Sequence, residues 1–252
     1  MDNVLSCLGG AFIQWASCIA VGLPLFLMAV RSTRHQGKAV DLGIAVQLAL
    51  FFLVSLALTR LEPMWPFTKK LWQSMTLEAL WALIFIFVTR SSSKAGLTLR
   101  ISSQAWRASL AATGLLLLFV LFRGLAIKLT GFGPSENAPL VLEFLLYQLT
   151  MPGLAEELSY RGAIQPGLNK IFGRPWRLLG AKVGWGWVIT SLIFWAPHAF
   201  RVDAQMQLSF YWPTLTMQLI AAFVFGWIRE RSGSVFPPML AHNLVNLVWT
   251  LL

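Results

Sequence analysis

The sequence contains a series of apolar runs that are each long enough to cross a lipid bilayer. A helix needs roughly 17–25 mostly apolar residues to span the hydrocarbon core. Hydrophobic residues make up 57% of the 252 positions, and charged residues make up only 12%, about half the share that is usual in soluble domains. So little polar sequence leaves no room for a separate soluble domain. We therefore expect an all-α, polytopic membrane helical bundle that forms one domain over residues 1–252.

Polar or proline-containing segments divide the chain into about eight transmembrane helices. The expected helical segments are residues 4–30, 42–59, 71–89, 108–130, 138–169, 183–200, 204–228 and 237–252. Residues 90–107 are expected to form an exposed loop, and residues 229–231 a tight connection. Pro152 and Gly153 are expected to kink or break the fifth segment. Proline suits the first turn of a helix, so Pro237 and Pro238 should begin the last one.

The net charge of +10 does not indicate nucleic-acid binding, because the basic residues lie in short loops between apolar runs. They form neither one basic face nor a low-complexity tail. Loops on one side of the predicted bundle hold about twice as many Lys and Arg residues as loops on the other. The positive-inside rule therefore predicts that both termini lie outside the cytoplasm. The compact loops favour a bacterial inner membrane.

Two adjacent carboxylates and an arginine interrupt the fifth apolar segment. Ionisable groups at membrane depth are candidates for function. Glu157 and Arg161 are four residues apart, so on a helix they share a face and can pair. Glu156 lies about 100° further round the helix, which leaves it available as a general base. A further acidic residue, Glu78, lies in the third run, either as a buried polar contact, which we favour, or at the membrane interface.

Two of the three histidines also lie inside apolar runs. His198 follows Phe194 by four residues, and His242 precedes Asn246 by four. Glu156 could take a proton from water that one histidine holds, while the other histidine and the asparagine amide stabilise an oxyanion. This set describes peptide-bond hydrolysis without a covalent intermediate. Because no G-x-S-x-G motif is present, a serine nucleophile is not expected.

A metal mechanism is the alternative for the same side chains. Glutamate and histidine are both ligands for zinc. The sequence has no H-E-x-x-H motif, in which two helical histidines bind zinc and the glutamate acts as base. We therefore expect no cofactor, with zinc-dependent hydrolysis as the second mechanism.

Three motifs, E-E-x-x-x-R, F-x-x-x-H and H-x-x-x-N, occur in this order on separate predicted helices. This pattern resembles the CPBP family, which includes the CAAX prenyl endopeptidases and the Abi-type intramembrane proteases. The matching residues are Glu156, Glu157 and Arg161 for the first motif, Phe194 and His198 for the second, and His242 and Asn246 for the third.

The resemblance implies roles for these residues within a catalytic half at about residues 137–252. Glu156 with His198 would activate the water, and His242 with Asn246 would form the oxyanion hole. Glu157 and Arg161 would shape and neutralise the site, and Phe194 would be a further supporting residue. We therefore expect Glu156, His198, His242 and Asn246 to converge on one cavity inside the bundle.

The function predicted from the residues and the resemblance is an intramembrane endopeptidase. Its substrate would be a membrane-associated peptide or protein, either lipidated or carrying a C-terminal sorting signal. One alternative is a non-catalytic membrane scaffold or bacteriocin-immunity protein. Another is a proton-coupled transporter, although the sequence shows no inverted repeat.

Overall fold

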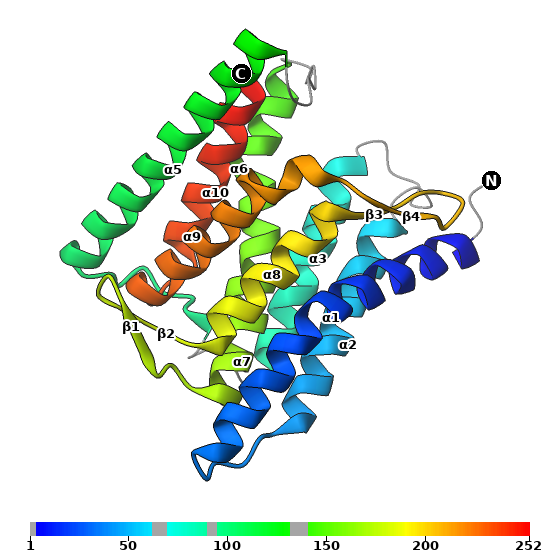
Figure 1. Cartoon of the computed structure of the whole chain (residues 1–252). Helices are drawn as coiled ribbons and strands as arrows, with labels where there is room; N and C mark the ends of the chain where they lie inside the picture. The colour runs from blue at the N-terminus through cyan, green and yellow to red at the C-terminus, as the bar shows by residue number, and fades with distance from the viewer. Residues whose placement is uncertain (1–3, 62–69, 90–94, 132–140) are drawn as a thin grey trace.

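The computed structural model describes residues 4–61, 70–89, 95–131 and 141–252 (Figure 1). Within these residues the chain forms a bundle of α-helices with two short antiparallel β-hairpins. The expected all-α class is confirmed.

The helices of the N-terminal half agree with the first four predicted runs. They are α1 (Val4–His35), α2 (Leu42–Arg60), α3 (Lys70–Val88) and α5 (Ser103–Thr130). α1 continues through basic residues that were expected in a loop. α5 begins earlier than predicted because the Ser102 side chain accepts a hydrogen bond from the backbone N–H of Ala105. It ends at Gly131, whose φ of 66° is left-handed. Residues 62–69 and 90–94, in the predicted connections, lie outside the described residues.

The C-terminal half is less regular than expected. Its elements are α6 (Leu142–Glu157), the π-helical segment η2 (Leu158–Ile164), α7 (Gln165–Phe172), β1 (Trp176–Leu178), β2 (Ala181–Val183), α8 (Trp185–Ala199), β3 (Phe200–Val202), β4 (Leu208–Phe210), the 3₁₀ segment η3 (Trp212–Leu215), α9 (Met217–Ser232) and α10 (Phe236–Leu251). The last helix begins with Pro237 and Pro238 in its first turn, as predicted.

The prediction of one helix over residues 204–228 is wrong in its first half. There the β3–β4 hairpin and η3 precede α9. The hairpin turn is organised by Asp203, whose Oδ1 accepts hydrogen bonds from the backbone N–H groups of Gln205 (3.0 Å) and Gln207 (2.8 Å). Residues 229–231 also form no connection, because α9 continues through them and is capped by Gly233.

Of the predicted kink or break at Pro152 and Gly153, the break is wrong, because α6 runs through both residues, and the kink stays a prediction. A side chain at position 153 would lie 2.5 Å from the carbonyl oxygen of Met239 and from Oδ1 of Asn243. Gly153 therefore allows α10 to approach α6 closely. The backbone departs from α-helical geometry later, in η2.

The helices that carry the motifs pack against one another. α6 contacts α10 and α3, α8 contacts α1 and α9, and α10 also contacts α5 and α9 (Figure 1). η2 contacts α3, α7 and α8. The three motifs, which lie far apart in the sequence, are thereby brought into one part of the bundle.

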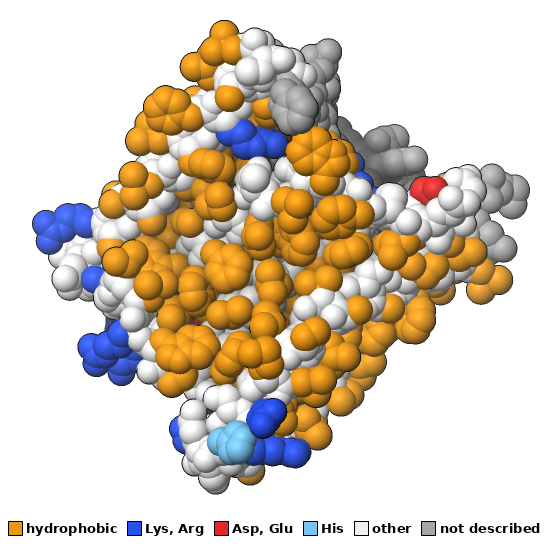
Figure 2. Space-filling view, viewed as in Figure 1, with side chains coloured by type: hydrophobic (Ala, Val, Ile, Leu, Met, Phe, Trp, Pro, Cys, Tyr) orange, Lys and Arg blue, Asp and Glu red, His pale blue; other side chains and the backbone are white. Residues whose placement is uncertain are grey.

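The surface agrees with an integral membrane protein. Within the described residues, α1, α2 and α5 are long and apolar enough to cross a membrane, and Trp72–Val88 is a shorter apolar helix. Figure 2 shows a face whose middle is covered by hydrophobic side chains, whereas most Lys and Arg lie toward its lower and left edges. The number of eight spans and the orientation of the termini stay predictions.

The close contact between α6 and α10 predicts different effects of two Gly→Ala substitutions. Gly153→Ala should destabilise the protein by about 1–3 kcal/mol, the usual cost of overpacking. The matched control is Gly114→Ala in α5, where an added Cβ meets no atom within 4 Å. Thermal unfolding in detergent measures both variants, and equal melting temperatures would contradict the inferred contact.

Candidate active site

A buried ion pair between Glu157 and Arg161 lies at the centre of the site. Nε of Arg161 lies 3.2 Å from Oε2 of Glu157, and both side chains are fully buried. The same guanidinium donates a hydrogen bond from Nη2 to the carbonyl of Ala222 in α9 (2.8 Å). Its Cζ lies 4.3 Å from the centroid of the Phe194 ring in α8, within the range of a cation–π contact. The predicted pairing is confirmed, and it joins α6, α8 and α9.

Arg161 lies in the π-helical segment η2 rather than in a regular helix. The backbone N–H of Gln165 donates to the carbonyl of Tyr160, five residues earlier. Every residue of η2 is buried. Single π-helical turns are frequent at functional sites because they re-aim side chains within a helix. Sequence spacing predicted the pairing, but not this local geometry.

His242 is held by the other oxygen of the same carboxylate. Its Nδ1 lies 3.0 Å from Oε1 of Glu157. Its ring stacks on Phe225, with 5.0 Å between centroids, and meets Phe194 edge-on at 5.7 Å. Because an ionised carboxylate only accepts hydrogen bonds, Nδ1 carries a proton in this contact. Glu157 therefore orients His242 as well as neutralising Arg161.

Glu156 faces a different space from its neighbour. It lines a cavity of about 220 Å³, and its Oε2 is buried without a hydrogen-bond partner among the described residues. The other residues that line this cavity are Gln14, Phe52, Ser55, Leu56, Thr59, Met75, Glu78, Tyr160, Pro197 and His198. One of the two adjacent carboxylates is thus consumed by an ion pair, and the other is left facing a cavity.

His198 lines the same cavity and is held by its own helix. Its Nδ1 lies 3.0 Å from the backbone carbonyl of Phe194. A carbonyl oxygen only accepts, so Nδ1 is the donor and Nε2 of the neutral ring keeps its lone pair. Glu156 and His198 therefore line one space, and their roles in proton transfer stay predictions.

The Phe194 ring lies between the two histidines. Its centroid is 5.3 Å from that of His198 and 5.7 Å from that of His242. The F-x-x-x-H motif thus supplies a ring that packs against both imidazoles and against the guanidinium of Arg161. This contact sets the spacing between the two halves of the candidate site.

Asn243, which lies three residues before Asn246, makes hydrogen bonds that the sequence did not predict. Oδ1 of Asn243 accepts from the backbone N–H of Gly153 (2.8 Å), and Nδ2 donates to the carbonyl of Thr150 (3.2 Å). Asn243 therefore ties α10 to α6. Asn246 is partly buried and is not among the described residues that line the cavity. Of the four predicted catalytic residues, Glu156 and His198 line the cavity. That His242 and Asn246 join them stays a prediction.

Glu78 is a third carboxyl group at the cavity, which the sequence suggested only weakly. It comes from α3 in the N-terminal half, is 6% exposed and lines the cavity with Glu156 and His198. The preference for a buried polar contact over an interfacial position is confirmed. The sequence feature that indicated its burial was an isolated acidic residue in the middle of an apolar run.

A metal centre was the alternative use of the same side chains. Among the described residues, no group of three or more His, Cys, Asp and Glu is placed to hold a metal ion. This geometry offers no multidentate set of the kind that structural and catalytic zinc sites use. Metal dependence is left to direct measurement.

A second polar cavity, of about 430 Å³, lies beside α7 and α9. Glu230 lines it and gathers several polar side chains. Oε1 accepts hydrogen bonds from Gln165 and Asn169, each at 2.6 Å, and Oε2 pairs with Arg174 at 3.0 Å. Because Arg229 of the same helix donates to the carbonyl of Arg161, this network also holds η2. Residues 229–231 are therefore structural rather than a loop.

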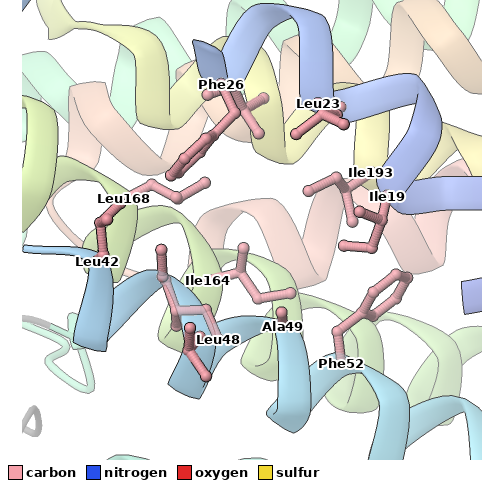
Figure 3. Close-up of a pocket in the computed structure, with 14 residues that line it drawn as sticks. Ile19, Leu23, Phe26, Leu42, Leu48, Ala49, Phe52, Ile164, Leu168 and Ile193 are labelled. Carbon is pink, nitrogen blue, oxygen red and sulfur yellow. The ribbon is translucent and has the colours of Figure 1, made fainter. Parts of the chain in front are cut away.

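An apolar groove of about 310 Å³ adjoins the cavity that Glu156 lines. Figure 3 shows side chains from α1, α2, η2, α7 and α8 pointing into it. Leu23, Leu42 and Val46, which line it, are 46%, 51% and 58% exposed, so the groove opens on the apolar surface. Phe52 lines both the groove and the cavity. The two spaces are therefore neighbours that share a wall.

The fold and the buried polar residues together define a membrane helical protein with a site inside the bundle. Residues 138–248 match the family described as type II CAAX prenyl endopeptidase Rce1-like. No curated protein and no solved structure matched the chain. The family match covers all three motifs and confirms the resemblance that they predicted. It implies a membrane protease that acts on membrane-associated proteins.

The buried ion pair predicts the effect of removing one partner. Arg161→Met should destabilise the protein by about 3–5 kcal/mol, because the Glu157 carboxylate is left buried and unpaired. The double variant Glu157→Gln/Arg161→Met should recover most of this loss. Chemical denaturation in detergent measures both, with the exposed Arg107→Met as the control. A double variant no more stable than Arg161→Met would contradict the assigned pairing.

Proposed function

We propose that the protein is a glutamate-type intramembrane endopeptidase in which Glu156 is the general base. The observation that carries the proposal is the separation of the two adjacent carboxylates. Glu157 is bound by Arg161 and His242, whereas Glu156 faces a cavity together with His198. A general base must be within reach of the water that it deprotonates, and this cavity has room for water beside both groups.

The proposed reaction begins with water held between Glu156 and Nε2 of His198. One O–H bond breaks and its proton goes to the Glu156 carboxylate, while the water oxygen bonds to the carbonyl carbon of the peptide. The carbonyl electron pair moves to oxygen. Glu156 then gives the proton to the leaving nitrogen, the C–N bond breaks and the carbonyl bond reforms. The new carboxylic acid passes its proton to the released amine.

His242 and Asn246 are proposed to stabilise the oxyanion that forms during this step. Preorganised donors contribute most where negative charge develops in a poorly solvated site. Because Nδ1 of His242 faces Glu157, donation from Nε2 requires an imidazole ring that carries both protons. Glu157 is the counterion for this form. In this scheme the ion pair holds the oxyanion side of the site, and Glu156 works on the water side.

The proposed substrate is a peptide or protein attached to the bilayer, either lipidated or carrying a C-terminal sorting signal. The apolar groove supports this substrate class, because it opens on the lipid-facing surface and shares Phe52 with the cavity. A membrane-embedded segment in the groove would bring the adjoining peptide to Glu156. We place the protein in a bacterial inner membrane, with both termini outside the cytoplasm.

The proposal predicts the outcome of one cleavage experiment on purified protein in detergent. Candidate membrane peptides are incubated with wild type and Glu156→Gln, each with and without a strong chelator. Wild-type cleavage should survive the chelator, and Glu156→Gln should lower the rate by at least about 10²-fold, because amide side chains cannot accept the proton. Unfolding curves should show that the variant is folded.

Two results would overturn this assignment. Loss of activity with chelator, restored by zinc, would replace the glutamate mechanism with metal-dependent hydrolysis. Equal cleavage by wild type and Glu156→Gln would remove Glu156 as the base. If neither protein cleaves peptides that include lipidated and sorting-signal sequences, the non-catalytic scaffold or immunity reading is favoured.

A further inference from the structure

Glu78 is a buried carboxyl group that the proposed mechanism has not used. It lies on α3, outside the segment that matches the protease family, and is 6% exposed. It nevertheless lines the same cavity as Glu156 and His198. Its carboxyl group meets the Ser159 side chain, but one hydroxyl does not offset the cost of burying an ionised carboxylate, which is several kcal/mol, so its position needs a physical explanation.

The described residues that line the cavity include two glutamates and no lysine or arginine. Two arginines of the described residues lie near this part of the bundle and have partners of their own. Arg161 in η2 pairs with Glu157. Arg60 at the end of α2 donates to Gln14 and to the backbone carbonyl of Val202.

The remaining titratable groups around Glu78 come from the elements packed against α3. Glu156 comes from α6 and Tyr160 from η2, which both pack against α3, and His198 of α8 lines the same cavity. Of these, Glu156 is the group that repels a charge on Glu78. Two carboxyl groups that share a poorly solvated space cannot both be ionised at little cost.

We infer that Glu78 and Glu156 share one proton, so that Glu78 is protonated while Glu156 is the ionised base. The inference rests on the proposed function and extends it with a positioning residue from the N-terminal half. Two observations support it. Oε2 of Glu156 is buried without a hydrogen-bond partner among the described residues, and Glu78 is buried at the same cavity. Glu78 keeps its proton through the reaction, so the atom balance of the hydrolysis is unchanged.

The shared proton has a consequence for the pH dependence. A coupled pair loses its two protons in two steps that belong to the pair. The active form carries one proton, so the rate rises with pH at the first loss and falls at the second. Without Glu78 the second step of the pair disappears from the alkaline limb, and only the fall caused by loss of a proton from His242 remains there.

The test compares the pH dependence of kcat for wild type, Glu78→Gln and Glu78→Asp, using protein whose activity survives the chelator. Glu78→Gln should lose the pair's second step from the alkaline limb, because its amide has no proton to lose there, so that only the fall caused by His242 remains. Its kcat near neutral pH and its KM should change little, because the amide is as neutral as the protonated carboxyl group. Glu78→Asp keeps a carboxyl group and should retain both limbs. Glu143→Gln is the matched control, because Glu143 is exposed on α6, away from the cavity.

A second measurement does not depend on activity. The infrared spectrum of wild type at neutral pH should contain the band of a protonated carboxyl group, which Glu78→Gln removes and Glu78→Asp shifts. Should Glu78→Gln fail to fold, the shift in Glu78→Asp decides the question. A Glu78→Gln variant whose alkaline limb is the same as that of wild type, or a band unchanged in both variants, would overturn the inference.

The two proposals fail in different ways. If wild type does not cleave, or Glu156→Gln cleaves equally well, the proposed function fails, and the infrared band still reports whether Glu78 is protonated. If Glu156→Gln is inactive while Glu78→Gln keeps the alkaline limb of wild type, only the shared proton is refuted.

Discussion

The ion pair between Glu157 and Arg161 is the interaction on which the rest of the site depends. Burying two opposite charges with no exposed surface costs solvation, which their mutual attraction and their other contacts must offset. The second oxygen of Glu157 meets His242, and the guanidinium reaches a carbonyl of α9 and the Phe194 ring. One pair therefore fixes the relative positions of η2, α8, α9 and α10.

The same pair assigns different tasks to two adjacent carboxylates. Successive residues on a helix point about 100° apart, so a contact that consumes Glu157 turns Glu156 toward other elements. These are α1, α2, α3 and α8, which enclose the cavity. The N-terminal half thus completes the wall of a site whose motifs all lie in the C-terminal half. Glu78 is its one acidic contribution among the described residues that line this cavity.

Much of this arrangement could be predicted from spacing alone. The apolar runs predicted the long helices, and the four-residue spacing of Glu157 and Arg161 predicted their pairing. The β3–β4 hairpin was missed because its apolar residues resemble a membrane span, while its turn depends on hydrogen bonds to Asp203. Asn243 was missed because its role depends on the approach of α10 to Gly153, a tertiary contact that no local pattern encodes.

The most direct test of the central claim is a cryo-electron-microscopy structure of Glu156→Gln with an uncleaved membrane peptide. The account predicts that the scissile carbonyl carbon lies in the cavity beside residue 156 and His198. One water molecule should lie between this carbon and the two side chains, with its oxygen about 3–3.5 Å from the carbonyl carbon. The apolar part of the peptide should follow the groove of Figure 3. A peptide bound instead in the polar cavity around Glu230 would contradict the assignment of the active site.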